Sequence, residues 1–260
     1  MSGAEGRRRL EQAAAILLKS SRVVAATGAG MSSESGIPTF RDALEGLWAH
    51  YDPEQLATRS GFQSNPARVW GWYNYRRGLI SCAEPHPGHH ALARLETILP
   101  DVVVVTQNID GLHLRAGSST VLELHGNINR FKCFDLDHPA TVELPVAPED
   151  GPLEPPPCPE CGSPLRPDVV WFGEMLPPGV FERAERHAAA CEVMLVIGTS
   201  GLVYPAAGLP AVARATGASV IEVNTAPSDL TFSGSVDIFL EGPAGELIPE
   251  LVQRMEAASR

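Results

Sequence analysis

Residues 23–36 read VVAATGAGMSSESG, and this stretch decides the fold. Residues 23–27 form a short, continuously apolar run, which is typical of a strand buried on both faces of a parallel sheet. Directly after the run, Gly28, Gly30 and Ser33 reproduce the spacing of a dinucleotide fingerprint, with serine in place of its third glycine. Such glycines let the backbone approach a pyrophosphate, but they also serve plain tight turns. The stretch therefore predicts a strand that ends at a nucleotide-binding turn, with the tight turn as the alternative.

Similar apolar runs recur along the chain and alternate with helical patterns. The other runs are residues 102–106, 121–124, 169–172, 193–197, 219–223 and 236–240. The helical patterns are residues 10–18, 89–99, 180–190, 205–216 and 247–258. This alternation predicts an α/β fold with a doubly wound, Rossmann-like parallel sheet, in which most of the runs are strands.

Two segments interrupt the alternation and predict a small second lobe built from two insertions. Residues 43–85 contain a long aromatic helix at 66–82, for which Asn65 and Pro66 supply the N-cap and the first residue. Residues 127–163 are irregular and rich in proline, like a zinc ribbon. Residues 1–42, 86–126 and 164–260 then form the Rossmann-like, nucleotide-binding domain. A ligand is expected at the carboxyl ends of its strands.

Composition and charge exclude several classes of protein. The formal net charge of −11 does not favour a nucleic-acid or anionic-lipid partner. The apolar runs are far shorter than the roughly 20 residues of a membrane span, and residues 1–9 lack the apolar core of a signal peptide. Five widely spaced cysteines do not fit a disulfide framework. We therefore expect a cytoplasmic protein with no nucleic-acid or membrane partner.

The continuation of the opening stretch, together with later motifs, matches one family. GAGMSSESGIPTFR, residues 28–41, resembles the signature of the sirtuins, the NAD-dependent protein deacylases of the Sir2 family. Further matches follow in the family's order: TQNIDGLH at 106–113, LHG at 124–126, VWFGE at 170–174, GTS at 198–200, VYP at 203–205 and Asn224. The resemblance runs from about residue 8 to about residue 250.

The resemblance implies an NAD+ site. Asp110 would accept from the nicotinamide carboxamide, Gln107 and Asn108 would hold the ribose and an ordered water, and Phe40 would shield the reacting sugar. For Asn108 and Asp110, the alternative is a cap at a helix N-terminus. The implied cofactor contacts are Gly28, Ala29, Gly30, Ser33, Pro38, Thr39, Phe40, Arg41, Gln107, Asn108, Ile109, Asp110, Gly198, Thr199, Ser200, Asn224 and Ala244.

His125 is the catalytic candidate, together with Asn108. Histidine titrates near neutral pH and can take a proton from a ribose hydroxyl. By resemblance, the acyl-lysine oxygen attacks C1′ of the nicotinamide ribose, nicotinamide leaves, and His125 activates the 2′-hydroxyl to attack the resulting imidate. The products would be free lysine, nicotinamide and O-acyl-ADP-ribose. His86, His89, His90, His113 and His138 are expected to be structural or surface residues.

Two segments match those that hold the acyl-lysine peptide in the family. They are residues 170–174 and 201–204, with Val170, Phe172 and Tyr204 as contacts. Backbone hydrogen bonds to an added strand tolerate many peptide sequences. We therefore expect acyl-lysine proteins or peptides as partners, with little sequence specificity.

The helix predicted at residues 66–82 carries residues that are candidates for binding the acyl group. Tyr73 and Arg76 are spaced i, i+3 and so share a helix face, and a guanidinium can bind a carboxylate through two hydrogen bonds. This matches the Tyr-x-x-Arg pattern of the class III sirtuins, which remove succinyl, malonyl and glutaryl groups, and Ala57 fits the small residue of their acyl pocket. Weaker deacetylation would accompany these activities. The alternative is that Arg76 and Arg77 form a solvated pair.

The cysteines leave the metal content open. Sirtuins usually hold a structural zinc with two Cys-x-x-Cys pairs, and Cys158 with Cys161 form a good second pair. The first pair lacks its fourth ligand, because Leu136 follows Cys133 at the ligand position. Asp135, Asp137 or His138 could substitute, although none stands at that position. The alternative is that the metal has been lost.

Two other functions remain open beside deacylation. The same cleavage of NAD+ serves an ADP-ribosyltransferase or an NAD hydrolase. The third hypothesis is a non-catalytic sensor of NAD+ or ADP-ribose, which the presence of His125, Asn108 and Asp110 disfavours. The oligomeric state, the protein targets and the order of preference among acidic acyl groups are not indicated by the sequence.

Overall fold

A computed structural model describes residues 3–38, 52–145 and 149–258. Its larger part is a six-stranded, wholly parallel sheet with the strand order β3-β2-β1-β7-β8-β9. The strands are β1 (Arg22–Thr27), β2 (Asp101–Thr106), β3 (Val121–Glu123), β7 (Val193–Ile197), β8 (Ser219–Asn224) and β9 (Ile238–Glu241). This order is that of a Rossmann-like sheet, which confirms the predicted fold class.

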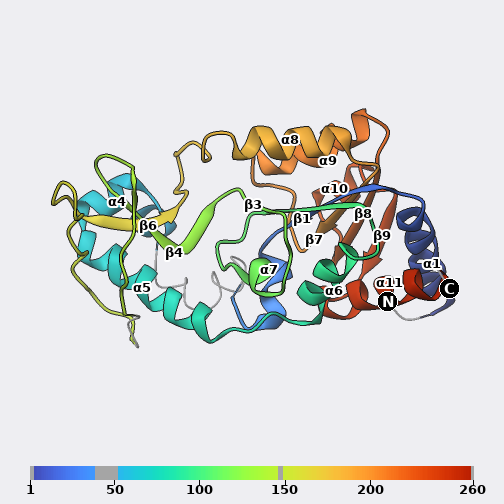
Figure 1. Ribbon diagram of the computed structural model, residues 1–260, viewed down its shortest axis with the longest axis horizontal. Helices are drawn as coiled ribbons and strands as arrows, with labels where there is room; N and C mark the ends of the chain where they lie inside the picture. Colours follow the sequence, from blue (N-terminus) through green and yellow to red (C-terminus); the bar gives the residue numbers. More distant parts are fainter. Residues whose placement is uncertain (1–2, 39–51, 146–148, 259–260) are drawn as a thin grey trace.

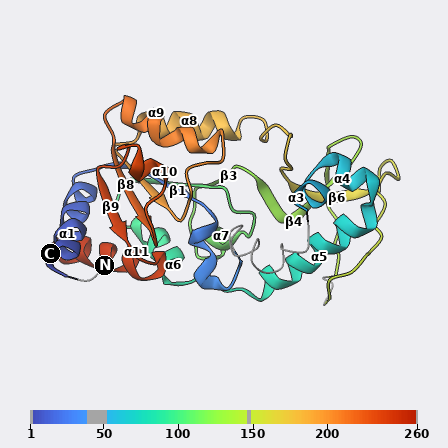
Figure 2. The same ribbon diagram turned by 180° about the vertical axis from the view of Figure 1, so that it is seen from behind.

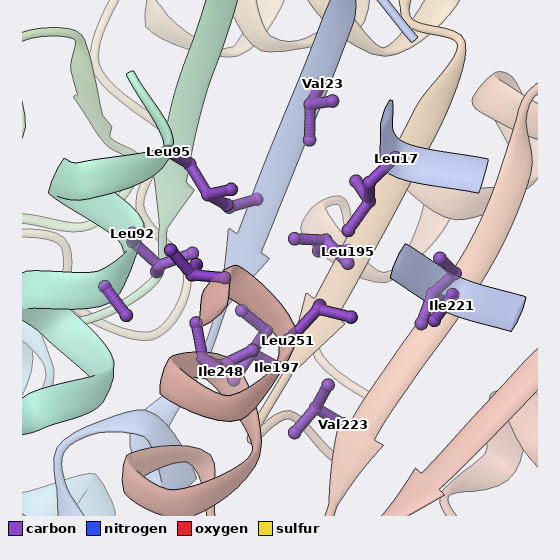
Figure 3. Packing of buried hydrophobic residues seen from close by; sticks show 14 of the residues in the cluster. Leu17, Val23, Leu92, Leu95, Leu195, Ile197, Ile221, Val223, Ile248 and Leu251 are labelled. Atoms are coloured by element: carbon purple, nitrogen blue, oxygen red, sulfur yellow. The ribbon is translucent and has the colours of Figure 1, made fainter. Parts of the chain in front are cut away.

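Helices cover both faces of this sheet (Figure 1). One face carries α1 (Ala4–Leu18), α6 (Pro87–Leu95) and α11 (Ala244–Ala258), and the other carries α8 (Val180–Ala190) and α9 (Leu209–Ala215). Along β1, Val23 and Ala25 belong to the first core and Val24 to the second. Figure 3 shows the first core, where Leu17, Leu92 and Leu251 converge from three helices onto the strands. Burial on both faces explains why the strands are continuously apolar.

A smaller unit lies at the opposite end of the molecule from β8 and β9 (Figures 1 and 2). It contains a three-stranded sheet in the order β5-β4-β6, with both pairs antiparallel. Its strands are β4 (Gly126–Cys133), β5 (Pro139–Ala140) and β6 (Leu165–Val169), and its helices are α3 (Pro53–Leu56), α4 (Arg59–Ser64) and α5 (Pro66–Cys82). A separate aromatic core that includes Phe62, Trp72 and Trp171 joins them. This unit is the predicted small lobe, while the exact domain boundaries given above stay predictions.

Short elements complete the described chain. They are the 3-10 helices η1 (Ala29–Met31), η2 (Ser33–Ser35) and η4 (Ala206–Gly208), and the helical turns α7 (Leu112–Arg115) and α10 (Asp229–Phe232). The helix at 66–82 is confirmed, and Asn65 caps it by accepting from the Arg68 amide over 3.1 Å. Within the described residues, no helix combines the length and the apolarity that crossing a membrane requires.

Two predictions in the small unit were wrong. The run at 169–172 was expected to be a strand of the parallel sheet, but the strand there is β6, which ends at Val169 and pairs with β4 in the antiparallel sheet. The segment after residue 127 was expected to be irregular, but β4 extends to Cys133. Asn127, Asn129 and Arg130 interrupt the apolar pattern of β4, so its sequence does not resemble a buried strand.

Candidate active site

The loops that follow β1 and β7 meet where the strand order changes direction, the usual ligand site of such sheets. The Gly30 amide donates to the Gly198 carbonyl over 2.8 Å. A Cβ on Gly30 would lie 2.8 Å from Gly198 Cα, and one on Gly28 would lie 2.9 Å from Gly198 O. Gly198 itself has a φ of +59°. A side chain is therefore excluded at Gly28, Gly30 and Gly198. The close packing of the two loops brings together Gly28, Ala29, Gly30, Gly198, Thr199 and Ser200.

A buried polar cluster lies beside these loops. The Asn108 side-chain amide donates to the Gly28 carbonyl and to Ser32 Oγ, both over 2.9 Å. Ser32 Oγ in turn donates to Asp110 Oδ2 over 2.7 Å. Asp110 Oδ1 also accepts from the amide of Leu112, the first residue of α7, although the N-cap of this helix is Gly111. Asp110 thus supports the start of α7 from one residue before the cap, and the same carboxylate belongs to the polar cluster.

Burial raises the pKa of Asp110. Loss of solvent raises the pKa of this carboxyl, while its hydrogen bonds from Leu112 and Ser32 and the positive charge of Arg76 oppose the rise. Ser32, which joins Asn108 to Asp110, was not singled out from the sequence. The sequence feature that could have identified Ser32 is its position inside the motif at residues 28–41.

Thr199 connects the remaining predicted cofactor residues. Gln107 Nε2 donates to Thr199 Oγ1 over 3.3 Å, and Asn224 Nδ2 donates to the Thr199 carbonyl over 2.9 Å. Gln107 and Thr199 follow β2 and β7, and Asn224 is the last residue of β8, so three strand ends converge here. Ile109 lies in the same loop as Gln107, and its carbonyl accepts from the Ile128 amide.

The N-terminus of α11 approaches the loop after β1. The Gly245 amide donates to Glu34 Oε2 over 2.7 Å, and Ala244 beside it is buried. Ser33 is exposed and donates to the Gly30 carbonyl over 2.9 Å, and Pro38 is exposed at the end of the described segment. Thr39, Phe40 and Arg41 lie outside the described residues.

The hydrogen bonding of His125 leaves one of its ring nitrogens as a base. His125 Nδ1 lies 3.0 Å from the Gln107 carbonyl oxygen. Because a carbonyl can only accept, Nδ1 carries the hydrogen, and Nε2 of the neutral ring keeps a free lone pair. Burial lowers the pKa of His125 below its ordinary 6.5, and the bond to Gln107 only partly opposes this. The ring is therefore neutral at pH 7, as a general base must be.

The two segments expected to hold the peptide expose apolar side chains. Phe172 is 59% exposed and Tyr204 is 77% exposed. The Val170 amide donates to the His125 carbonyl over 2.9 Å, which links the first segment to the catalytic candidate. The Phe172 amide donates to the Ala57 carbonyl over 2.8 Å, so Ala57 lies next to this segment.

The acyl-pocket candidates on α5 face the same region. Tyr73 is buried, and its hydroxyl oxygen accepts a hydrogen bond from Trp171 Nε1 over 3.0 Å. Burial lowers the pKa of Arg76, while the charge of Asp110 acts in the opposite direction. Arg76 is half-buried, with its guanidinium 4.8 Å from the centre of the Trp72 ring, so it is not a freely solvated residue. Arg77 points elsewhere, since it donates to the Leu144 and Pro145 carbonyls.

A buried ion pair supports Trp171. The Arg166 side chain is fully buried, donates to both oxygens of Glu174, and lies 3.4 Å from the centre of the Trp171 ring. Glu174 also accepts from the Trp171 amide over 2.9 Å. A buried charge is stable only when it is paired in this way. Arg166 stands outside every sequence motif considered above and was missed.

The structure supplies the fourth metal ligand that the sequence left open. Ligand atoms of Cys133, His138, Cys158 and Cys161 all lie within 4.8 Å of one another. Cys133 Sγ is 3.5 Å from Cys161 Sγ, and Cys158 Sγ is 3.7 Å from His138 Nε2. Ligands at 2.0–2.3 Å from a tetrahedral zinc would be separated by about 3.5–3.8 Å. Of the three substitutes considered from the sequence, His138 is the one that lies with the three cysteines, and these four side chains could hold a metal ion such as zinc.

Comparisons with known proteins agree with this geometry. A model of the Sir2 family matches residues 28–205. An NAD-dependent protein deacylase of Pseudomonas putida is 48% identical over 253 residues, which are 96% of this chain and 96% of that protein. The solved structure of a Sir2 homologue in complex with NAD is 42% identical, with a TM-score of 0.87 and coverage of 96% of this chain and 95% of that chain.

A second solved structure adds information on acylated peptides. A Sir2 protein bound to a myristoylated histone peptide is 34% identical, with a TM-score of 0.76 and coverage of 97% of this chain and 98% of that chain. The predicted resemblance is confirmed by these matches together. This chain belongs to the Sir2 family.

Proposed function

We propose that this protein is an NAD-dependent protein-lysine deacylase that transfers the acyl group to ADP-ribose. The observation that carries the proposal is the bonding of His125, which fixes its tautomer and leaves Nε2 as a neutral base next to the loop of Gln107, Asn108 and Asp110. The relative from Pseudomonas putida, which carries the name of this activity, supports the proposal.

The described residues would divide the work on NAD+ as co-substrate. The loops at Gly28–Gly30 and Gly198–Ser200 would hold its phosphates and adenosine half, since glycines at Gly28, Gly30 and Gly198 let the two loops pack closely at the ends of β1 and β7. Asn108 and Asp110 would bind the nicotinamide ribose and carboxamide with polar atoms that are already desolvated. His125 Nε2 would take the proton of the ribose 2′-hydroxyl, which makes that oxygen the attacking group.

Within this activity, we propose a preference for acidic acyl groups such as succinyl, malonyl and glutaryl. Tyr73 accepts from Trp171, so its own O–H is available to donate to a ligand. Burial raises the pKa of the Tyr73 hydroxyl, which keeps it protonated. Arg76 would add a positive charge that burial makes costly and that a carboxylate would stabilise.

The metal group would hold a structural zinc ion. Cys133, His138, Cys158 and Cys161 would complete a closed tetrahedral shell, which leaves no open position for catalysis. When bound, the ion would supply a cross-link between β4, the turn after it and the loop before β6. These four residues would thereby stabilise the small unit through the bound ion, without a part in the acyl chemistry.

A panel of acyl peptides tests the substrate class. Peptides that carry succinyl-, acetyl- or myristoyl-lysine are incubated with and without NAD+, and kcat/KM is measured for each by mass spectrometry. The proposal expects NAD-dependent removal with the order succinyl above acetyl. Faster removal of myristoyl than succinyl would contradict the acidic preference. Release of ADP-ribose with all peptides untouched would indicate an NAD hydrolase, and binding without turnover would indicate a sensor.

A further inference from the structure

Three buried histidines lie behind the loop after β1, and the chemistry proposed above uses none of them. His86 is the N-cap of α6, His89 lies in its first turn, and His113 lies in α7. They are 7%, 0% and 2% exposed. The ring centres of His86 and His89 are 4.2 Å apart, and those of His89 and His113 are 4.9 Å apart. The three rings therefore form one contiguous group.

The hydrogen bonds of the group fix the tautomer of each ring. His86 Nδ1 accepts from the Gly88 amide, so its hydrogen is on Nε2, which donates to the Met31 carbonyl over 2.5 Å. His89 Nδ1 accepts from the His86 backbone amide over 3.3 Å, so its hydrogen is also on Nε2. His113 Nε2 lies 3.0 Å from Thr27 Oγ1, and that hydroxyl donates its own hydrogen to Thr106 Oγ1. His113 Nε2 is therefore the donor as well.

Two complementary atoms remain after this assignment. His89 Nε2 carries a hydrogen and His113 Nδ1 carries a lone pair, and both are buried with no hydrogen-bond partner among the described residues. Such orphaned polar atoms are rare in protein interiors because each costs free energy. A hydrogen bond between two imidazole nitrogens places the ring centres about 5 Å apart. The observed 4.9 Å between the ring centres of His89 and His113 matches this separation, so a rotation that turns the two atoms toward each other would satisfy both at once.

We propose that His86, His89 and His113 form a neutral hydrogen-bonded relay, closed by a bond from His89 Nε2 to His113 Nδ1, that positions the loops of the NAD+ site. At one end, His86 holds the Met31 carbonyl in the loop after β1. At the other end, Thr27 and Thr106 transmit the bond to the backbone amide of Asn108. The effect of the relay on NAD+ binding rests on the proposed function, since these loops are the proposed NAD+ contacts.

Burial keeps the relay neutral at physiological pH. Desolvation lowers the pKa of His89 to about 2 and that of His113 to about 4. A protonated ring would carry hydrogen on both nitrogens and could not accept from its neighbour. The three histidines are therefore positioning residues rather than acids or bases in the reaction.

Two substitutions of His113 test its two hydrogen bonds separately, because each keeps one bond and removes the other. His113→Gln places an amide donor near the position of Nε2 and so keeps the bond to Thr27. His113→Asn places an amide oxygen near the position of Nδ1, so it can accept from His89 but loses the bond to Thr27. His90→Ala, an exposed residue of the same helix, is the control. ADP-ribose affinity by calorimetry, KM for NAD+, kcat and thermal stability are measured for each variant.

The relay predicts that each His113 variant raises the Kd for ADP-ribose and the KM for NAD+ by about tenfold, with kcat changed less than twofold. The double variant His113→Asn with His89→Ala should bind no more weakly than His89→Ala alone. Unchanged affinity in both single variants, with only the melting temperature lowered, would overturn the positioning role.

A spectroscopic signature tests the relay without relying on catalysis. Long-range ¹H–¹⁵N spectra of the full chain at pH 7 should show all three rings as neutral tautomers with hydrogen on Nε2. A charged ring, or a hydrogen on Nδ1 of His89 or His113, would overturn the proposal. These spectra are informative even if the protein hydrolyses no acyl-lysine, so failure of the relay and failure of the proposed function are distinguished.

Discussion

Trp171 Nε1 donates a hydrogen bond to the Tyr73 hydroxyl oxygen over 3.0 Å. This bond joins the segment that would hold the peptide to the helix that would hold the acyl group. It also sets the polarity of the pocket, because a hydroxyl that accepts from an indole can donate only in another direction. In the proposed acyl site, the Tyr73 hydroxyl would donate to the carboxylate together with the guanidinium of Arg76.

Replacing Arg76 by Met should change the choice of acyl group. A charged hydrogen-bond donor in a desolvated site contributes enough to lower kcat/KM for desuccinylation by about 10- to 100-fold. Deacetylation should change little, since an acetyl group has no carboxylate. Arg77→Met is the matched control, because Arg77 donates to the carbonyls of Leu144 and Pro145 instead. Equal loss of both activities in Arg76→Met would mean that Arg76 is structural.

The acid limb of the pH profile should report His125. Burial lowers the pKa of this ring below 6.5, so the neutral base form is fully present at pH 7 and is lost only as pH falls through the lowered pKa. The plot of kcat/KM against pH should therefore drop with a midpoint below 6.5. His125→Asn should lower kcat by about 10²- to 10⁴-fold. A midpoint above 7 would argue against His125 as the base.

Zinc content should depend on His138. Metal analysis of the purified chain should find one zinc ion per molecule, and chelation should lower the melting temperature by about 5 °C or more. His138→Ala should weaken zinc retention, whereas His138→Cys should preserve it because thiolate is an equally good ligand. Glu154→Ala, at an exposed position in the loop before β6, is a control that removes a charge but no ligand. Full zinc retention in His138→Ala would exclude the histidine from the site.

The contact between the two glycine loops should be intolerant of a methyl group. In Gly30→Ala, the added Cβ would lie 2.8 Å from Gly198 Cα, so the loops must separate. We expect the Kd for ADP-ribose to rise by about tenfold, since overpacking of this kind costs about 1–3 kcal/mol. Gly151→Ala is the control, because nothing lies within 4 Å of its Cβ position. Unchanged ADP-ribose affinity in Gly30→Ala would place the cofactor elsewhere.

The sequence predicted the parallel sheet well because burial on both faces leaves continuously apolar strands such as β7. It failed for β4 and β6, where polar residues occupy strand positions and Arg166 is buried only because Glu174 pairs with it. The ion pair that compensates the buried charge of Arg166 forms between residues that only the fold brings together. His138 is a similar case, since its five-residue separation from Cys133 matches no Cys-x-x-Cys spacing. The tautomer of His125 likewise depends on the Gln107 carbonyl, which sequence spacing does not locate.

The most direct test of the central claim is the product balance of one reaction. A succinyl-lysine peptide is incubated with NAD+, and the peptide, nicotinamide and nucleotide products are quantified by mass spectrometry. Our account predicts equal amounts of unmodified peptide, nicotinamide and O-succinyl-ADP-ribose. Nicotinamide and free ADP-ribose formed while the peptide keeps its succinyl group would contradict it.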